Sequence, residues 1–168
     1  NIVDYILVKQ GAKINAVGTP DKPIVMTSEK EEPGAWGGIH ICGKAHTNAE
    51  GGKGSSEIGG AVYGGNDDAD NSGTLQYIRL EYTGFAFDEE HEANGISFYG
   101  VGNGTIVDHC EAYKGSDDGF EFFGGSVNVS NMVVVSCSDD SFDWTEGWNG
   151  KGTDLVAYQE AKATLGYD

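Results

Sequence analysis

The chain has 168 residues, of which 27 are glycine and only 3 are proline. This length suits a single domain with its own hydrophobic core, and so much glycine predicts many tight turns. The formal net charge of −17 disfavours nucleic acid as a partner, because binding it requires clustered cations. No apolar run approaches the length of a transmembrane helix. We therefore expect residues 1–168 to form one domain of a longer protein, without a transmembrane segment.

The N-terminal part of the chain contains two strand-like segments, DYILVKQGAKI at 4–14 and KPIVMTS at 22–28. A different segment, GGIHICG at 37–43, follows them and returns 57 residues later as NGISFYG at 94–100. We call this second pattern the short repeat. All four segments are rich in aliphatic, β-branched or aromatic residues, which favours strands.

Two stretches interrupt the repeats, at 44–73 and 85–93. The first is rich in glycine, serine and aspartate. The second surrounds His91 with the acidic residues Asp88, Glu89, Glu90 and Glu92. Because long loops on a rigid scaffold often carry function, we expect both insertions to lie near a functional surface.

A longer strand segment alternates with the short repeat, and we call it the long repeat. Its copies are LQYIRLEYTG (75–84), IVDHCEAYKG (106–115), VSNMVVVSC (129–137) and GTDLVAYQ (152–159). We expect 4–14 and 22–28 to be its first copies.

The strongest internal match joins SDDGFEFFGG at 116–125 to SDDSFDWTEG at 138–147, at an offset of 22 residues. The same segment also matches the copy at 94–100 at an offset of 24 residues. Side-chain identity at a fixed offset indicates stacked coils. The sequence therefore predicts an all-β fold, a parallel β-helix (solenoid) of about five coils with loop insertions at 44–73 and 85–93.

Alternation along each strand predicts which side chains point inward. The predicted inner stack consists of Ile96, Phe98, Phe120, Phe122, Phe142 and Trp144. The predicted outer columns are His40, Ser97, Glu121 and Asp143, and Cys42, Tyr99, Phe123 and Thr145. In this register the remaining cysteines, Cys110 and Cys137, lie too far apart to be bridged, so we expect three free thiols.

The repeats also resemble a family of secreted or surface-anchored right-handed parallel β-helix proteins of Gram-negative bacteria, many of them described as lipoproteins or secretion-system cargo. The matching segments are residues 11–28, 33–48, 63–84, 94–125 and 138–144. The resemblance implies a right-handed β-helix in an extracytoplasmic setting, secreted or anchored at the outer surface. It implies no reaction, because it carries over no catalytic residues. The acidic loop 85–93 departs from the family pattern.

The first candidate site is an acidic ladder on adjacent coils, made of Asp117, Asp118, Asp139 and Asp140. Adjacent coils lie about 4.8 Å apart, so the stacked charges repel one another. A Ca²⁺ ion with oxygen ligands would relieve this repulsion. Capping of turns by the aspartates and protonation at raised pKa values are the alternatives.

A second candidate metal site is the loop GNDDADNSG at 65–73, with Asp67, Asp68 and Asp70. The loop lacks the spacing and the terminal glutamate of an EF-hand. An ordered polar loop is the alternative interpretation.

Ligand-binding candidates lie on the outer strand face. Tyr99, Phe123 and Trp148 could stack on sugar rings, and Glu121 and Asp143 could contact a ligand beside them. The same two carboxylates could instead serve a polysaccharide lyase or a glycoside hydrolase, since hydrolysis needs two carboxyl groups at a fixed separation.

We therefore expect an extracytoplasmic module that acts as a surface binding or structural element, glycan-binding and stabilised by Ca²⁺. A polysaccharide-active enzyme working through Glu121 and Asp143 is the alternative. Expected partners are a polysaccharide or a surface protein. An end-to-end dimer or additional domains would cover the open ends of the solenoid.

Overall fold

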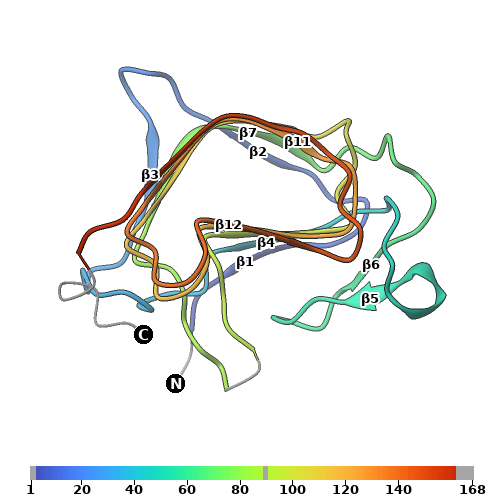
Figure 1. The fold of residues 1–168 in the computed structure, drawn as a ribbon, viewed down its shortest axis with the longest axis horizontal. Helices are drawn as coiled ribbons and strands as arrows, with labels where there is room; N and C mark the ends of the chain where they lie inside the picture. The colour runs from blue at the N-terminus through green and yellow to red at the C-terminus, as the bar shows by residue number, and fades with distance from the viewer. Residues whose placement is uncertain (1–2, 89–90, 162–168) are drawn as a thin grey trace.

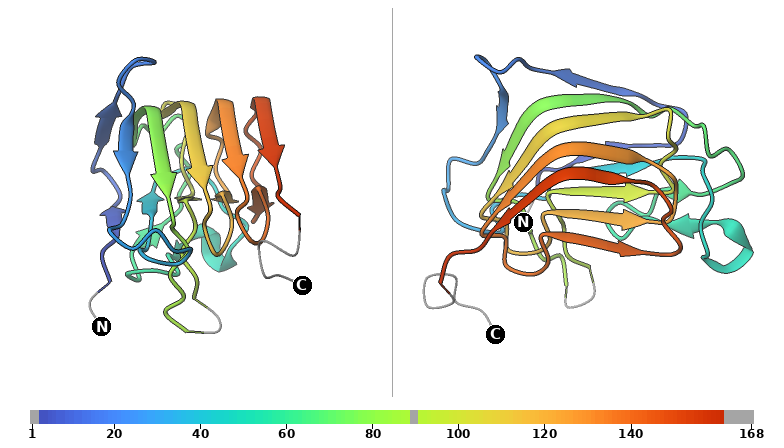
Figure 2. Two further views of the ribbon diagram at one scale, coloured as in Figure 1. Left: turned by 90° about the vertical axis from the view of Figure 1, so that its left-hand side faces the viewer. Right: turned by 45° about the horizontal axis from the view of Figure 1, so that its top comes forward.

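The computed structural model describes residues 3–88 and 91–161. Its coils are stacked closely enough to superpose when viewed along the stack (Figure 1), and the side views separate them (Figure 2). One face is a parallel sheet in the order β1 (Ile6–Val8), β4 (Ile39–Cys42), β8 (Ile96–Tyr99), β10 (Phe120–Phe123) and β12 (Phe142–Thr145). We call it the first sheet.

A second parallel sheet closes each coil. Its order is β13 (Gly152–Tyr158), β11 (Asn128–Val135), β9 (Ile106–Tyr113), β7 (Gly73–Glu81) and β2 (Ile14–Val17), with β3 (Ile24–Met26) also paired to β7. The described residues hold one short 3₁₀ helix, η1 (Glu50–Gly52), and no helix long and apolar enough to cross a membrane. The all-β, parallel β-helix prediction is confirmed.

The strand register confirms the alignment of the short repeat. Phe120 pairs with Phe142 at the predicted offset of 22 residues and with Ile96 at 24. Ile39 pairs with Ile96 at 57. Internal identity therefore located four of the five strands of the first sheet, β4, β8, β10 and β12, to the residue.

The prediction for the first coil was wrong in part. Segment 4–14 is not a copy of the long repeat, because its strand β1 pairs with β4 and belongs to the first sheet. The long strand of this coil is split into β2 and β3 by a turn in which Thr19 and Lys22 form a bridge. Strand composition alone does not say which sheet a segment joins.

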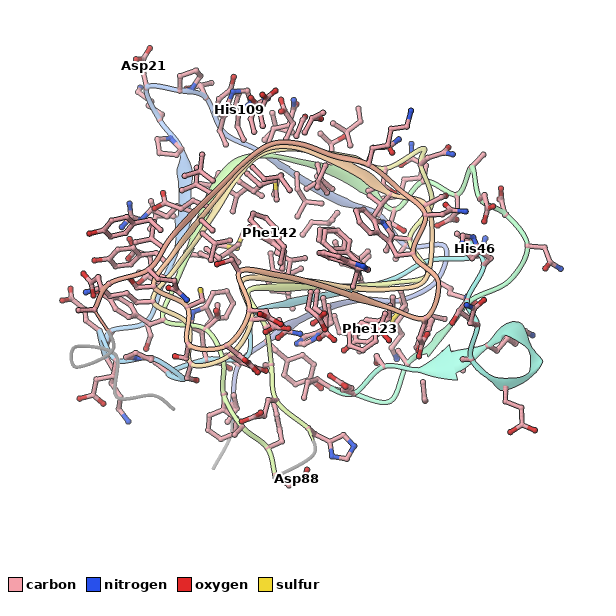
Figure 3. All side chains as sticks on the ribbon, viewed as in Figure 1. Asp21, His46, Asp88, His109, Phe123 and Phe142 are labelled. Carbon is pink, nitrogen blue, oxygen red and sulfur yellow. The ribbon has the colours of Figure 1, made fainter. Side chains whose placement is uncertain are left out.

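Stacked aromatic rings fill the interior of the coils. The ring of Phe122 lies 5.0 Å from that of Phe98 at an angle of 8° and 4.5 Å from that of Trp148. Figure 3 shows Phe142 inside the coil, where its ring stacks on Phe120 at 5.8 Å. The inward prediction therefore holds for the four phenylalanines of the stack.

Two tryptophans differ in exposure from what the sequence predicted, although Trp144 keeps the predicted pairing with Phe122. Trp144, predicted inside, is 61% exposed, whereas Trp148, predicted as a ligand-binding surface residue, packs on Phe122. The chain turns back at Glu146 and Gly147, which both have positive φ. This turn carries Trp148 into the coil, where its Nε1 donates a hydrogen bond to the Val127 carbonyl.

The part of the outer face of the first sheet that carries Tyr99 and Phe123 is covered rather than exposed. Tyr99 is 1% and Phe123 7% exposed, because the insertion 44–73 folds over them with the hairpin β5 (Gly54–Ser55) and β6 (Val62–Tyr63). Figure 3 shows Phe123 on the outside of the coil, toward this hairpin. The prediction that Tyr99 and Phe123 offer exposed rings to a ligand was wrong, since the insertion buries both.

The insertion is held to the last coil through Glu146. The buried Tyr63 hydroxyl donates to both carboxylate oxygens of Glu146 at 3.0 Å, and the Thr47 hydroxyl donates to one of them. His46 adds a contact between its Nε2 and the Gly147 carbonyl at 2.9 Å. Side chains far apart in sequence therefore tie the insertion to the solenoid.

Glu146→Ala is expected to lower the free energy of unfolding by about 1–3 kcal/mol, because it leaves the buried Tyr63 hydroxyl without its acceptor. Urea denaturation checks this. In a Tyr63→Phe background the same substitution should cost less, and an equal cost in both backgrounds would show that this hydrogen bond is not what holds the insertion.

The three cysteines are free and buried, as predicted. Burial raises the pKa of Cys42 and Cys137 to about 11 and that of Cys110 to about 12. Because the thiolate is the reactive form, we expect no reaction with Ellman's reagent in the native protein and reaction of all three thiols in denaturant. Rapid labelling of the native protein would contradict the packing described above.

Candidate cation site

A cavity of about 230 Å³ opens over the outer face of the first sheet, and all seven side chains that line it are carboxylic acids. They are Glu57, Glu92, Asp117, Asp118, Glu121, Asp139 and Asp143. We call it the acidic cavity. Among the residues that the structure describes, no lysine, arginine or histidine lines it to offset the charge.

The floor of this cavity is formed by residues at equivalent positions of adjacent, regularly stacked coils. Glu121 in β10 and Asp143 in β12 are directly paired in the parallel register, so their side chains emerge one above the other. Asp117 and Asp118 lie in the turn before β10, and Asp139 lies in the equivalent turn before β12. The repeat itself therefore superposes acidic residues on neighbouring coils.

The two insertions supply the remaining walls. Glu57 follows β5 in the insertion 44–73, and Glu92 closes the loop 85–93, where it forms a bridge with Ala86. Sequence reasoning did not single out Glu57, because nothing in a non-repeating insertion indicates which side chain it returns to the solenoid. Glu92 was noticed only as part of an acidic loop.

The carboxylates come close enough to share a cation. Oxygen atoms of Asp117, Asp118 and Asp139 lie within 4.8 Å of one another, and so do those of Asp118, Glu121 and Asp143. Asp118 belongs to both groups. This donor set contains only oxygen, which suits a hard cation such as Ca²⁺.

Burial makes ionisation of these groups costly. It is the leading cause that raises the pKa of Asp117 to about 7, that of Asp118 to about 8 and that of Glu121 to about 9. Neighbouring carboxylates add to each shift, including Glu92 beside Asp117 and Glu57 beside Glu121. At neutral pH the cavity therefore retains protons that a bound cation would displace.

Asn94 fixes one wall of the cavity. This side chain is 1% exposed, and its Nδ2 donates to Glu121 Oε2 at 2.6 Å and to Ser97 Oγ at 3.0 Å. Its Oδ1 has no hydrogen-bond partner among the described residues. Asn94 aligns with Asp118 in the short repeat, so the repeat contained the signal that this position faces the site.

The structure brings together most of the predicted acidic ladder. Asp117, Asp118 and Asp139 join it, whereas Asp140 is exposed and belongs to neither carboxylate group. The Asp140 backbone N–H instead donates to Asp118 Oδ1 at 2.8 Å, so Asp118 caps a turn as well as lining the cavity.

The acidic loop 85–93 contributes less than its composition suggested. Glu89 and Glu90 lie outside the described residues. His91 pairs with Asp88 at 2.6 Å and lines a neighbouring cavity that shares Glu57 with the acidic cavity.

The aspartates of the loop 65–73 form hydrogen bonds within the structure and do not gather into a cluster of carboxylates. Asp68 Oδ1 accepts hydrogen bonds from the backbone and the ring of His46, and Asp70 Oδ2 accepts one from Ser72. Within the described part of the chain, neither carboxylate group includes Asp67, Asp68 or Asp70. The contacts agree with the ordered polar loop that was the alternative interpretation.

Comparison with models of known protein families gave a match that extends over the whole chain. A family model described as a pectate-lyase-like beta helix domain matches residues 1–168. The chain belongs to this family. Comparisons with curated proteins and with solved structures gave no match.

Membership of the pectate-lyase-like β-helix family agrees with the stacked parallel sheets and with the β-helix part of the sequence resemblance. The family describes the fold of this domain and leaves its ligand and any reaction to be argued from the site. Bacterial origin, secretion and surface anchoring stay predictions.

Proposed function

We propose that this pectate-lyase-like β-helix domain is an extracytoplasmic binding or structural module whose acidic cavity holds Ca²⁺. The observation that carries the proposal is the lining of one cavity by seven carboxylic acids without a basic side chain. The closely spaced oxygens of Asp118, Glu121 and Asp143 support it further.

Ca²⁺ fits this donor set better than other common ions. It takes six to eight oxygen ligands in flexible geometry, whereas Mg²⁺ demands a tight octahedron and Zn²⁺ favours nitrogen and sulfur. Ligands from Glu57 and Glu92 would join those of the coils. Bound Ca²⁺ would thus fasten both insertions to the solenoid.

An extracytoplasmic location suits a site of this kind. Extracellular Ca²⁺ modules work at dissociation constants of roughly 10⁻⁴–10⁻³ M, which the Ca²⁺ outside cells can fill. Competition with protons on Asp118 and Glu121 argues for such moderate affinity. We expect the partner to be a polysaccharide or a surface protein.

Thermal melting of EDTA-treated protein tests the proposal. At the Kd proposed above, 10 mM Ca²⁺ is about ten to a hundred times Kd, and binding to the folded state alone should stabilise it by about 1.4–2.7 kcal/mol. The melting temperature should therefore rise by several degrees. Matched ionic strength in NaCl and the same concentration of Mg²⁺ are the controls. A shift that NaCl reproduces, or no shift at all, would remove the proposal.

Matched variants locate the effect. Asp118→Asn combined with Glu121→Gln should abolish the Ca²⁺ shift, since Asp118 belongs to both carboxylate groups and Glu121 to one. Asp67→Asn combined with Asp70→Asn should leave the shift intact. The reverse pattern would assign the ion to the loop 65–73.

Glycoside hydrolysis by the same residues is the second candidate. Glu121, with its pKa raised to about 9, could donate a proton beside Asp143. A lyase is disfavoured because no basic side chain of the described residues lines the cavity. Release of reducing ends from polysaccharides, abolished by Glu121→Gln without a lower melting temperature, would establish this candidate in place of the binding module.

A further inference from the structure

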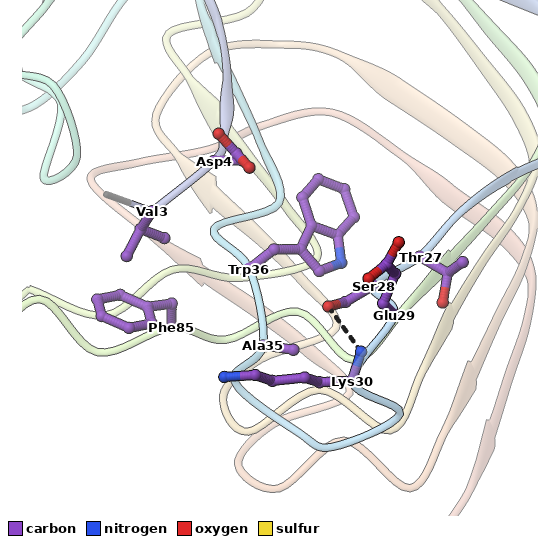
Figure 4. A pocket seen from close by; sticks show the side chains of 9 residues that line it. All are labelled: Val3, Asp4, Thr27, Ser28, Glu29, Lys30, Ala35, Trp36 and Phe85. Atoms are coloured by element: carbon purple, nitrogen blue, oxygen red, sulfur yellow. Dashed lines mark hydrogen bonds between the residues drawn. The ribbon is translucent and has the colours of Figure 1, made fainter. Parts of the chain in front are cut away.

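Another cavity, of about 610 Å³, lies beside the first coil. Apart from Phe85, which is near Glu92, its lining residues are far in sequence from those of the acidic cavity. Its walls include Asp4, Thr27, Glu29, Lys30, Trp36 and Phe85. Figure 4 shows the indole of Trp36 at the centre, between the side chains of Asp4 and Ser28, with Phe85 to one side. We call it the Trp36 cavity.

The aromatic wall of the Trp36 cavity is held in place. Trp36 Nε1 donates to the Glu81 carbonyl at 2.7 Å, and the ring packs against the hydrophobic core. The backbone N–H of Phe85 donates to the Trp36 carbonyl at 3.3 Å, and that of Gly37 donates to the Asp4 carbonyl at 2.9 Å. Three separate segments are therefore fixed around one indole.

The polar wall contains side chains that are free to bond to a ligand. Among the described residues, the side chains of Asp4, Thr27 and Glu29 make no hydrogen bond or ion pair. The ammonium of Lys30 forms no ion pair with them either. Donors and acceptors thus face the cavity beside an aromatic surface.

This combination selects the class of ligand. Two carboxylates and one ammonium leave the lining with a net negative charge, which disfavours an anion. The polar lining disfavours a wholly apolar molecule. A neutral saccharide meets both conditions, because its hydroxyls hydrogen-bond to the polar side chains while its C–H face stacks on an aromatic ring.

We propose that the Trp36 cavity binds a neutral saccharide, with Trp36 as the stacking surface and Thr27 and Glu29 as hydrogen-bonding groups. Across residues 3–88 and 91–161, the two cavities share no lining residue. The proposal therefore does not rest on Ca²⁺ in the acidic cavity, and saccharide binding should be equal in EDTA and in Ca²⁺.

Isothermal titration calorimetry with β-1,4-linked tetrasaccharides of glucose, xylose and mannose tests this proposal, with tetragalacturonate as the anionic comparison. At least one neutral tetrasaccharide should bind at a one-to-one ratio with millimolar or tighter Kd, and tetragalacturonate should bind more weakly. Absence of binding by all three neutral sugars, or tighter binding of tetragalacturonate, would overturn it.

Substitutions in the Trp36 cavity test whether the saccharide binds there. Trp36→Phe keeps an aromatic ring in the packing and should weaken binding about tenfold, a loss of about 1.4 kcal/mol. Thr27→Val combined with Glu29→Gln changes exposed side chains and should weaken binding without affecting the fold. Trp144→Phe alters an exposed tryptophan outside this cavity and should bind as wild type. Unchanged affinity in both cavity variants would refute the assignment.

Discussion

Phe122→Ala is expected to lower the free energy of unfolding by about 3–5 kcal/mol, the usual cost of removing a buried phenylalanine ring. The Phe122 ring lies between those of Phe98 and Trp148, at 5.0 and 4.5 Å. Its removal opens a cavity inside the coil that the stacked backbone cannot close, because the strand spacing is fixed by hydrogen bonds on both sides.

The matched control is Trp144→Ala, at the residue paired with Phe122 on the next coil. Since Trp144 is 61% exposed, its substitution should cost less than about 1 kcal/mol. Urea denaturation followed by circular dichroism measures both variants. Equal losses would mean that Trp144, and not Trp148, closes the aromatic stack.

Raising the pH from about 6.5 to 8.5 without divalent cations is expected to lower the melting temperature. The pKa values of Asp117, Asp118 and Glu121 are raised to about 7, 8 and 9 in the folded protein, whereas unfolded carboxyl groups titrate near 4. Across this pH range the folded state binds protons that the unfolded state has already lost. Stability therefore falls as pH rises through the folded pKa values.

Other titrating groups act mainly outside this window or can be controlled. Buried His40 has its pKa lowered to about 4, so it stabilises with rising pH only up to about 6.5. The raised pKa of His46 acts in the same direction as the carboxylates. Comparison with the combined Asp118→Asn and Glu121→Gln variant separates these contributions.

That variant should melt at a higher temperature than wild type at pH 8.5 in EDTA, because it lacks the buried carboxyl groups of Asp118 and Glu121, which begin to ionise as the pH approaches their raised pKa values of about 8 and 9. It should also show a flatter dependence on pH. If the melting temperature of the wild type rises over this range, or if the variant shows the same dependence on pH, burial does not raise the pKa values of Asp118 and Glu121 as described.

The repeating part of the molecule was readable from sequence because stacking imposes the same environment on equivalent residues. The match between 116–125 and 138–147 gave the pairing of Glu121 with Asp143 to the residue. It thereby predicted the floor of the acidic cavity. It also placed Asp118 beside the equivalent turn of the next coil, where the Asp140 N–H donates to Asp118 Oδ1.

The parts that were not predicted depend on segments without a repeat. Nothing in 44–73 indicates that its hairpin covers Tyr99 and Phe123, since that contact joins residues by tertiary packing alone. Trp148 was misplaced for a related reason. Alternation along β12 continues the pattern of Phe122 to Trp144, but the turn at Glu146 and Gly147 substitutes a different ring.

The central claim is that the acidic cavity is a Ca²⁺ site. Diffraction from crystals grown with Ca²⁺, collected at a long wavelength for its anomalous signal, tests this most directly. We predict an anomalous peak within bonding distance of carboxylate oxygens of Asp118 and of Asp139 or Glu121. A cavity without such a peak, or a peak only beside Asp67 and Asp70, would contradict it.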